Sequence, residues 1–273
     1  MNPTIDPLLT SIHNDRVKSW AALLEKKHRD RSGLFLIEGI HLVLEAFAER
    51  ADIQSVVYHA ERGIPEELLR SDVIGNADAS SHAVWFQASS SVMAKCTGTD
   101  SPPPVFAVVK KPQSNKTELF RSDSFVVVLD GVRDPGNVGT IIRSADAIGA
   151  HAVILGKGCA DIYNPKTVRS TMGSLFHLPI LEGAELTGLL AEAKEHGIQL
   201  VGTSLQAEHT CYSYDWKQPT WLLMGSEGDG LSAQVSAMVN TSVIIPMAGR
   251  AESLNVSVAA GVLLFEALRQ RSL

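Results

Sequence analysis

The sequence predicts an α/β protein of two domains, in which a small α/β domain precedes a larger one with a mainly parallel sheet. Three observations support this. The length of 273 residues suits two domains of ordinary size. Strand-like apolar runs alternate with helical periodicity in both halves. A polar segment at residues 112–123, rich in Pro, Ser, Asn and Lys, separates the halves.

The first half, residues 1–111, has the pattern of a compact α/β module. Residues 14–28 show helical spacing, with Val17, Trp20 and Leu24 on one side. The run LFLIEG at 34–39 predicts a strand that ends in a turn. Further helices are expected at residues 41–49, 65–70 and 90–96, and further strands at 53–58, 83–86 and 105–110.

The second half, residues 124–273, follows the predicted linker at 112–123. Its first run, FVVVLD at 125–130, is typical of a strand buried on both faces of a parallel sheet. Alternation of such runs with helices indicates a mainly parallel sheet. Strands are also expected at 152–155, 199–203, 221–224 and 242–245, and helices at 138–148, 166–172, 185–196, 232–239 and 255–270.

Composition excludes several classes of protein. The net charge of −6 argues against a protein that coats nucleic acid nonspecifically, because phosphate binding needs clustered Lys and Arg. Cys96, Cys159 and Cys211 lie far apart without CxxC spacing or His partners, so we expect no disulfide and no metal site. With no apolar run long enough for a membrane and no signal-peptide pattern at the start, we expect a cytoplasmic protein.

Cationic side chains nevertheless gather between residues 14 and 32. Two interpretations fit such a cluster: a surface that faces a phosphate backbone, or a solvated helix face. The same two interpretations apply to the later helix that carries Lys166 and Arg169. The candidate RNA-binding residues are Arg16, Lys18, Lys26, Lys27, Arg29 and Arg169.

Three loops carry the residues most suited to chemistry, since ligands of open α/β sheets sit beyond the carboxyl ends of strands. The first is DGVRDPGNVGTIIRSADAIGA at 130–150, where glycines allow a close backbone approach and Asn137 and Arg143 supply an amide and a guanidinium. Its glycine spacing matches neither GxGxxG nor GxxxxGK[ST], which argues against a Rossmann cofactor site or a P-loop.

The second loop is LLMGSEGDGLS at 222–232. Glu227 and Asp229 make it acidic, so it suits a cationic or hydroxyl-rich ligand and repels phosphate, which favours a sulfonium cofactor over a nucleoside triphosphate. The third is IIPMAGRAESLNVSVAAGVLLFEALRQR at 244–271, with Ser253 and Asn255 at the start of a helix. Taken singly, each of those two residues is most simply a helix N-cap.

Together the three loops resemble the three motifs of the SpoU (TrmH) family of RNA ribose methyltransferases, in the SPOUT superfamily. DPGNVGTIIRSADAIGA is similar to the first motif, LLMGSEGDGLS to the second and IPMAGRAESLNVSVAAGVLLFEALRQ to the third, in the family's order along residues 124–271. NPKTVRSTMGSLFHLPI resembles the connecting segment, within which the apolar context of His177 indicates a core residue. The amino-terminal half resembles the ribosomal-protein-like domain that binds RNA in many members.

This resemblance implies a deep trefoil knot at the carboxyl end and a homodimer with active sites at the interface. It also implies S-adenosylmethionine as cofactor and structured RNA, ribosomal rather than transfer RNA, as substrate. The cofactor-binding residues that it implies are Thr203, Gly225, Ile245, Met247, Leu254 and Asn255.

The resemblance gives Arg143 the task of activating the ribose 2′-hydroxyl. Because a guanidinium stays protonated, we expect it to stabilise the developing alkoxide and to hold a neighbouring phosphate. Asn137, Ser253 and Asn255 would orient Arg143 and the ribose, and Glu227 would anchor the site or the cofactor's amino group.

Four alternatives are open at this point. A noncatalytic RNA-binding protein would bind no cofactor. A SPOUT enzyme that methylates a base would leave an alkali-sensitive linkage at the modified nucleotide. A conventional Rossmann methyltransferase would need the glycine fingerprint that is missing here. Methylation of transfer RNA in place of ribosomal RNA is a fourth.

Overall fold

The computed structural model describes residues 5–70, 83–113 and 119–272. These residues form two compact units. The first contains the chain up to Gln113 together with Tyr163–Phe176, and the second contains the intervening chain up to Ile162 together with His177 onward. Residues 114–118 of the predicted linker lie outside the described residues.

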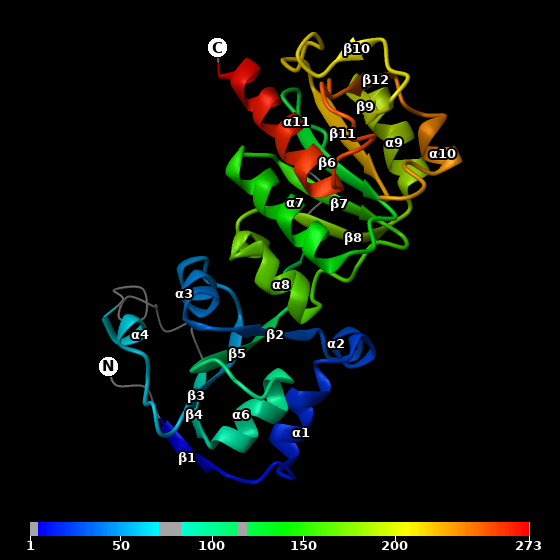
Figure 1. Ribbon diagram of the computed structural model, residues 1–273. Coiled ribbons are helices and arrows are strands. Elements are labelled where there is room, and N and C mark those ends of the chain that lie inside the picture. The colour runs from blue at the N-terminus through cyan, green and yellow to red at the C-terminus, as the bar shows by residue number, and fades with distance from the viewer. Residues whose placement is uncertain (1–4, 71–82, 114–118, 273) are drawn as a thin grey trace. The chain divides into compact units, whose positions relative to one another are not determined.

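The first unit is built on a mixed sheet whose strands run in the order β1-β4-β3-β5-β2 (Figure 1). β5 pairs antiparallel with both β2 and β3, while β4 pairs in parallel with β1 and β3. The strands are β1 (Ile5–Leu9), β2 (Leu34–Glu38), β3 (Ile53–His59), β4 (Val84–Ala88) and β5 (Val105–Lys110). The helices are α1 (Asp15–Ala22), α2 (Lys26–Ser32), α3 (Ile40–Ala48), α4 (Glu66–Arg70), α6 (Ser90–Thr97) and α8 (Pro165–Thr171), with a 3₁₀ turn at Ser174–Phe176.

Aromatic packing centres the core of this unit on Trp20. Its ring lies edge-on to Phe86 and Phe106, at centroid distances of 5.2 and 5.9 Å. Val17 and Met93 are fully buried in the same cluster. The periodic apolar face predicted for residues 14–28 therefore faces the core, as expected from its spacing.

The predicted single helix at 14–28 is two helices in the structure. α1 ends at Ala22 and α2 begins at Lys26. Arg29 donates from Nη1 to the carbonyl of Leu23 at 2.6 Å, which satisfies an acceptor that the end of α1 leaves open. No glycine or proline marks this break, so the sequence gives no signal for it.

The second unit contains a parallel sheet in the strand order β10-β12-β9-β11-β6-β7-β8, which confirms the predicted class (Figure 1). The strands are β6 (Phe125–Asp130), β7 (Ala152–Gly156), β8 (Ile180–Ala184), β9 (Gln199–Thr203), β10 (His209–Thr210), β11 (Thr220–Gly225) and β12 (Thr241–Ile244). The helices are α7 (Pro135–Ala147), α9 (Leu186–Glu195), α10 (Ala233–Ser236) and α11 (Val256–Arg271).

Central strands β6 and β11 carry the core of this unit. Val126, Val128, Trp221 and Leu223 are fully buried in one cluster with residues of β7 and α9. On the sheet, the final helix α11 packs along α7 (Figure 1). The helices that follow two of the predicted loops are therefore neighbours, which brings their amino-terminal residues into one region.

No helix of the described residues combines the length and hydropathy needed to cross a membrane. No cluster of three or more His, Cys, Asp or Glu side chains suited to a metal ion occurs among them either. The knot implied by the family resemblance stays a prediction.

Candidate active site

The three predicted loops follow strands β6, β11 and β12, whose carboxyl ends meet at one edge of the parallel sheet. The loop after β6 is joined to the loop after β11, because the Asp130 carboxylate accepts a hydrogen bond of 2.7 Å from the backbone of Ser232. Asp134 then caps α7 by accepting from the backbone of Asn137 at 2.8 Å, and Pro135 occupies the first helical position. Local capping thus sets the direction of the Asn137 side chain.

A tight turn forms the loop after β11. Ser226 and Gly230 exchange two backbone hydrogen bonds of 2.9 and 3.1 Å. A Cβ atom at Gly225 would lie only 2.1 Å from the carbonyl carbon of Gly230, so no other residue fits at this position. Gly230 itself has a φ of +68°, which favours glycine. This turn carries Glu227 to the surface of the site.

Side chains from all three loops are joined in one chain of hydrogen bonds. The Asn137 amide donates from Nδ2 to Glu227 Oε1 at 2.5 Å, and Asn255 Nδ2 donates to Asn137 Oδ1 at 3.1 Å. Asn255 Oδ1 accepts from the backbone of Ser257 at 2.9 Å and so also caps α11. Capping and site-building are therefore combined in Asn255, where sequence reasoning treated them as alternatives.

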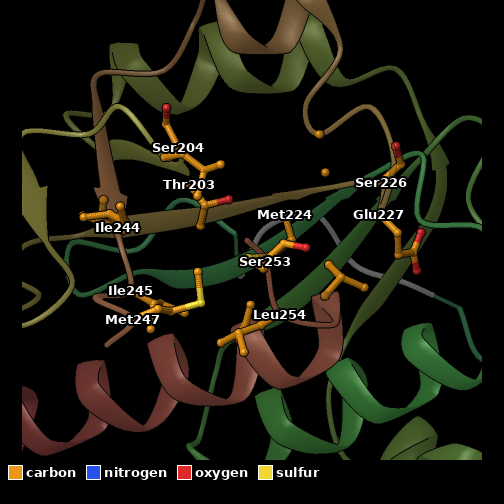
Figure 2. Close-up of a pocket in the computed structure, with 16 residues that line it drawn as sticks. Thr203, Ser204, Met224, Ser226, Glu227, Ile244, Ile245, Met247, Ser253 and Leu254 are labelled. Carbon is orange, nitrogen blue, oxygen red and sulfur yellow. The ribbon is translucent and has the colours of Figure 1, made fainter. Parts of the chain in front are cut away.

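Beside this chain lies a cavity of about 250 Å³. In Figure 2, Ser226 and Glu227 lie at one end of it and Ile244 and Met247 at the other. Its lining residues come from the ends of β9, β11 and β12, from the loops that follow these strands and from the start of α11: Thr203, Ser204, Leu205, Met224, Gly225, Ser226, Glu227, Gly230, Val243, Ile244, Ile245, Met247, Ser253, Leu254, Val256 and Ala259.

Most of the predicted site residues are brought together here. Thr203, Gly225, Ile245, Met247 and Leu254 all line the cavity. Glu227 and Ser253, expected to be catalytic, line it too, whereas Asn255 and Asn137 lie outside the lining and reach it through Glu227. Sequence reasoning missed Ser204, Leu205 and Ser226, although Ser204 and Ser226 directly follow the predicted site residues Thr203 and Gly225.

Arg143 is separate from the cavity within one chain. It lies on α7, about one and a half turns beyond Asn137, and its side chain is exposed. Its guanidinium makes no hydrogen bond or ion pair with the described residues, and it does not line the cavity. The Arg143 guanidinium is therefore available to a group outside this chain.

The predicted RNA-binding residues lie in the first unit, and they differ in exposure. Arg16, Lys18, Lys26 and Lys27 are exposed. Lys18, Lys26 and Lys27 form surface ion pairs of 3.2 to 3.3 Å, and the Arg16 guanidinium lies 4.6 Å from the ring centre of Phe86. Such exposed pairs are weak and exchange readily with another anion.

Two assignments from the sequence are corrected. Arg29 was expected to contact RNA, but it is only 2% exposed and its guanidinium binds the Leu23 carbonyl, so it joins α1 to α2. His177 was expected in the core, but its side chain is 30% exposed and its Nδ1 lies 2.7 Å from the carboxylate of Asp146. The residues that neighbour a polar side chain in the sequence do not show which group it contacts in the folded chain.

Comparison with protein families gives two matches. Residues 124–265 match the model described as the SpoU rRNA Methylase family. Residues 14–107 match the model described as the MRM3-like substrate binding domain. The first match contains the first two loops of the site and the third as far as residue 265, which includes Ser253 and Asn255.

Whole-chain relatives are also known. The chain is 35% identical over 257 residues to the 23S rRNA (guanosine(2553)-2'-O)-methyltransferase RlmP of Bacillus subtilis, covering 94% of this chain and 97% of the relative. It is 37% identical over 268 residues to the 23S rRNA (uridine(2479)-2'-O)-methyltransferase of Streptomyces viridochromogenes, covering 94% and 91%.

Solved structures show the same arrangement of the chain. The crystal structure of an AdoMet-bound rRNA methyltransferase from Sinorhizobium meliloti superposes with a TM-score of 0.84 at 34% sequence identity. The superposition covers 97% of this chain and 98% of that one.

Proposed function

The chain belongs to the SpoU rRNA methylase family, and from that membership we propose that it methylates a ribose 2′-hydroxyl of ribosomal RNA with S-adenosylmethionine. The observation that carries the proposal is the hydrogen-bond chain from Glu227 through Asn137 to Asn255. It joins the three motif loops beside one cavity, so the residues that define the family also form one local structure.

The cavity fits an adenosyl sulfonium ligand. Its walls combine the apolar side chains of Ile244, Ile245 and Met247 with hydroxyls of Thr203 and Ser253, which suits a nucleoside with a flat base and a polar ribose. The Glu227 carboxylate at one end suits a positively charged group. S-adenosylmethionine, when bound, supplies an electrophilic methyl group on a positively charged sulfur.

The protein's own contribution is to position the ribose and to stabilise charge. Asn137 and Asn255 are held rigidly by their mutual hydrogen bond, so they can orient a ribose hydroxyl at little entropic cost. The positively charged guanidinium of Arg143 stabilises the negative charge that develops on the 2′-oxygen and holds an adjacent phosphate. The hydroxyl proton leaves to phosphate or to water.

We further propose that the protein works as a homodimer in which Arg143 of one subunit serves the cavity of its partner. Val258 and Phe265 on α11 are 53% and 52% exposed, and they lie about two turns apart on the same face of the helix. This apolar stripe lies on the helix that packs along α7, the helix that carries Arg143. A second copy of the chain would cover the stripe and bring Arg143 to a cavity that it does not line in its own chain.

Domain roles follow the family matches. We propose that residues 1–111 bind RNA, that 112–123 form a linker and that 124–273 carry the catalytic site with a trefoil knot. The exposed cations of α1 and α2 support an RNA-binding role for the first domain. Ribosomal RNA as substrate supports a cytoplasmic location.

Transfer of labelled methyl groups to ribosomal RNA tests the function. The substrate is large-subunit ribosomal RNA from a strain that lacks this gene, and the control is RNA from the parent strain. We expect methylation of the first RNA alone, at one nucleotide whose 3′ linkage then resists alkali. An alkali-sensitive linkage would indicate base methylation, and label only in transfer RNA would overturn the substrate assignment.

A further inference from the structure

An ion pair in the first unit joins a buried carboxylate to an exposed guanidinium. Arg169 on α8 donates from Nη1 to Glu38 Oε2 at 2.9 Å, across 131 residues of sequence. The Glu38 side chain is 8% exposed and that of Arg169 is 53% exposed. The pair therefore has a fixed inner partner and an outward-facing outer partner.

Burial of the Glu38 carboxylate is energetically unfavourable. Its second carboxylate oxygen, Oε1, is buried, and in the described part of the chain it has no hydrogen-bond partner. Burial raises the pKa of the Glu38 carboxyl above its usual value, against the effect of Arg169, which lowers it. Burying a charged group with incomplete pairing is unfavourable, so stability alone gives no reason for an acid here.

Other contacts already hold the α8 segment in place. The ring of Phe35 on β2 lies 4.7 Å from that of Tyr163 and 6.3 Å from that of Phe176. His41 Nε2 lies 3.0 Å from the carbonyl of Met172. Because both ends of the segment are anchored in this way, the particular effect of Glu38 is to fix the direction of the Arg169 guanidinium.

Arg169 has donors to spare in that orientation. A guanidinium carries five N–H groups in a planar fork, and only one of them binds Glu38. No other partner of the Arg169 guanidinium is found among the described residues. The remaining donors suit bidentate binding of a phosphate, a geometry that an arginine provides and a lysine does not.

The basic helix α2 lies at the same edge of the sheet. Both α2 and α8 contact the edge strand β2. The Lys111 ammonium lies 2.8 Å from the Asp30 carboxylate of α2 and 4.6 Å from the ring centre of Tyr163, which precedes α8. The two helices together expose Lys26, Lys27, Arg31, Lys166 and Arg169, against the single acid Asp30.

We propose that Glu38 is a positioning residue that presets Arg169 to bind an RNA phosphate on a composite surface formed by α2, Lys111 and α8. This inference rests on the proposed function, since it takes RNA as the ligand. The proposed surface combines cations of α2 and α8, which are 135 residues or more apart in the sequence. It is a local cationic surface on a chain whose net charge is −6.

An RNA-binding measurement over a range of salt concentrations tests the proposal. It uses the full-length protein and protein-free large-subunit ribosomal RNA from a strain that lacks the gene. We expect Arg169→Gln to weaken binding about tenfold and to reduce the salt slope by about one phosphate contact. Arg169→Lys should weaken binding as well, because a lysine keeps the charge and loses the fork. The matched control is Arg70→Gln, which breaks an exposed ion pair of 3.0 Å with Glu66 in the same unit.

The sign of the effect at Glu38 separates positioning from simple charge. Glu38→Ala removes a negative charge, so charge alone predicts tighter RNA binding, whereas loss of positioning predicts weaker binding. Glu38→Gln keeps an acceptor for Arg169 and should bind RNA as well as the unmodified protein or better. Glu66→Gln is the control. Adding Arg169→Gln to Glu38→Ala should cause little further loss.

Several results would overturn the proposal: tighter binding by Glu38→Ala, equal binding by Arg169→Lys and the unmodified protein, or an Arg169→Gln effect no larger than that of Arg70→Gln. If Glu38→Ala does not fold, as judged by its thermal unfolding, Glu38→Asp takes its place: it keeps the charge and shortens the reach to Arg169, so it should weaken RNA binding, and binding equal to that of the unmodified protein would overturn the proposal. Methyl transfer by the unmodified protein is measured in parallel. Its absence would count against the proposed function, whereas transfer without any Arg169 effect on binding would count against this inference alone.

Discussion

Asn137 and Glu227 are joined by a side-chain hydrogen bond of 2.5 Å although 90 residues separate them in the sequence. Asn137 also accepts from Asn255, so a single amide connects the loops after β6 and β11 with the start of α11. Because the amide has one donor group and one acceptor, both of its ends are needed. Each loop therefore depends on the other two for its position.

Reversing the polarity of the Asn137–Glu227 pair tests this dependence. Asn137→Asp places two carboxylates at hydrogen-bond distance, so we expect turnover to fall at least about tenfold through like-charge repulsion and loss of the donor. Adding Glu227→Gln restores a donor and an acceptor, and part of the activity should return. A double variant no better than Asn137→Asp would show that the pair itself is not what matters. Single-turnover methyl transfer gives the measurement.

Arg143→Ala should abolish methyl transfer and leave cofactor binding largely intact. Arg143 does not line the cavity, so its removal takes away charge stabilisation without changing the cofactor's contacts. We expect a loss of about a hundredfold or more. Calorimetric titration with S-adenosylmethionine gives the affinity of the same preparation, and normal activity in this variant would remove Arg143 from the mechanism.

Mixed dimers test whether Arg143 acts across subunits. Arg143→Ala and Glu227→Ala should each be inactive alone. If each site combines Arg143 of one subunit with the cavity of the other, a mixed dimer contains one intact site, and mixing the two inactive proteins should restore activity. Differently tagged chains verify that the subunits exchange. If activity is not recovered after exchange, Arg143 and the cavity that it serves lie in the same subunit.

The turn after β11 provides a matched pair of glycine variants. A Cβ at Gly225 would collide with the Gly230 backbone at 2.1 Å, whereas a Cβ at Gly228 meets nothing within 4 Å. We expect Gly225→Ala to lower the free energy of unfolding by about 1–3 kcal/mol and to abolish cofactor binding. Gly228→Ala should stay within about 0.5 kcal/mol. Equal free energies of unfolding for the two variants in denaturant titrations would contradict the close approach of Gly225 to the Gly230 backbone.

Acid should weaken the last helix through Glu266. Its pKa is lowered from 4.5 to about 2, mainly by a hydrogen bond from Arg269, with help from Gln270 and against the effect of burial. Because the folded-state pKa is the lower one, the stabilisation is complete above 4.5 and is lost as the pH falls toward 2. Glu266→Gln should therefore be less stable than the unmodified protein at pH 7, and the difference should shrink below pH 4. A difference independent of pH would show that charge is not its origin.

Local signals in the sequence predicted much of the fold. The uninterrupted run at Phe125–Asp130 is a fully paired central strand with five buried residues. Asn255 caps α11, as its place in the sequence suggested, whereas α7 begins three residues earlier than predicted, after the cap Asp134. β8 was missed, because glutamate and glycine break its apolar pattern and Gly183 has a φ of +65°. β1 was missed as well, since a proline is tolerated only at a sheet edge, where β1 lies.

The sequence by itself determined most of the elements, the cap at Asn255 and the glycine-bearing loops, because these depend on neighbours a few residues away. It also supplied the residues of the cavity through their likeness to known motifs. Only the tertiary structure decided which polar groups meet: Asn137 with Glu227, Arg169 with Glu38, and Arg29 with the backbone of α1. Those pairings depend on the order of strands in each sheet and on burial. A periodic pattern predicts which face of an element is apolar, but it does not predict which residues pack against that face.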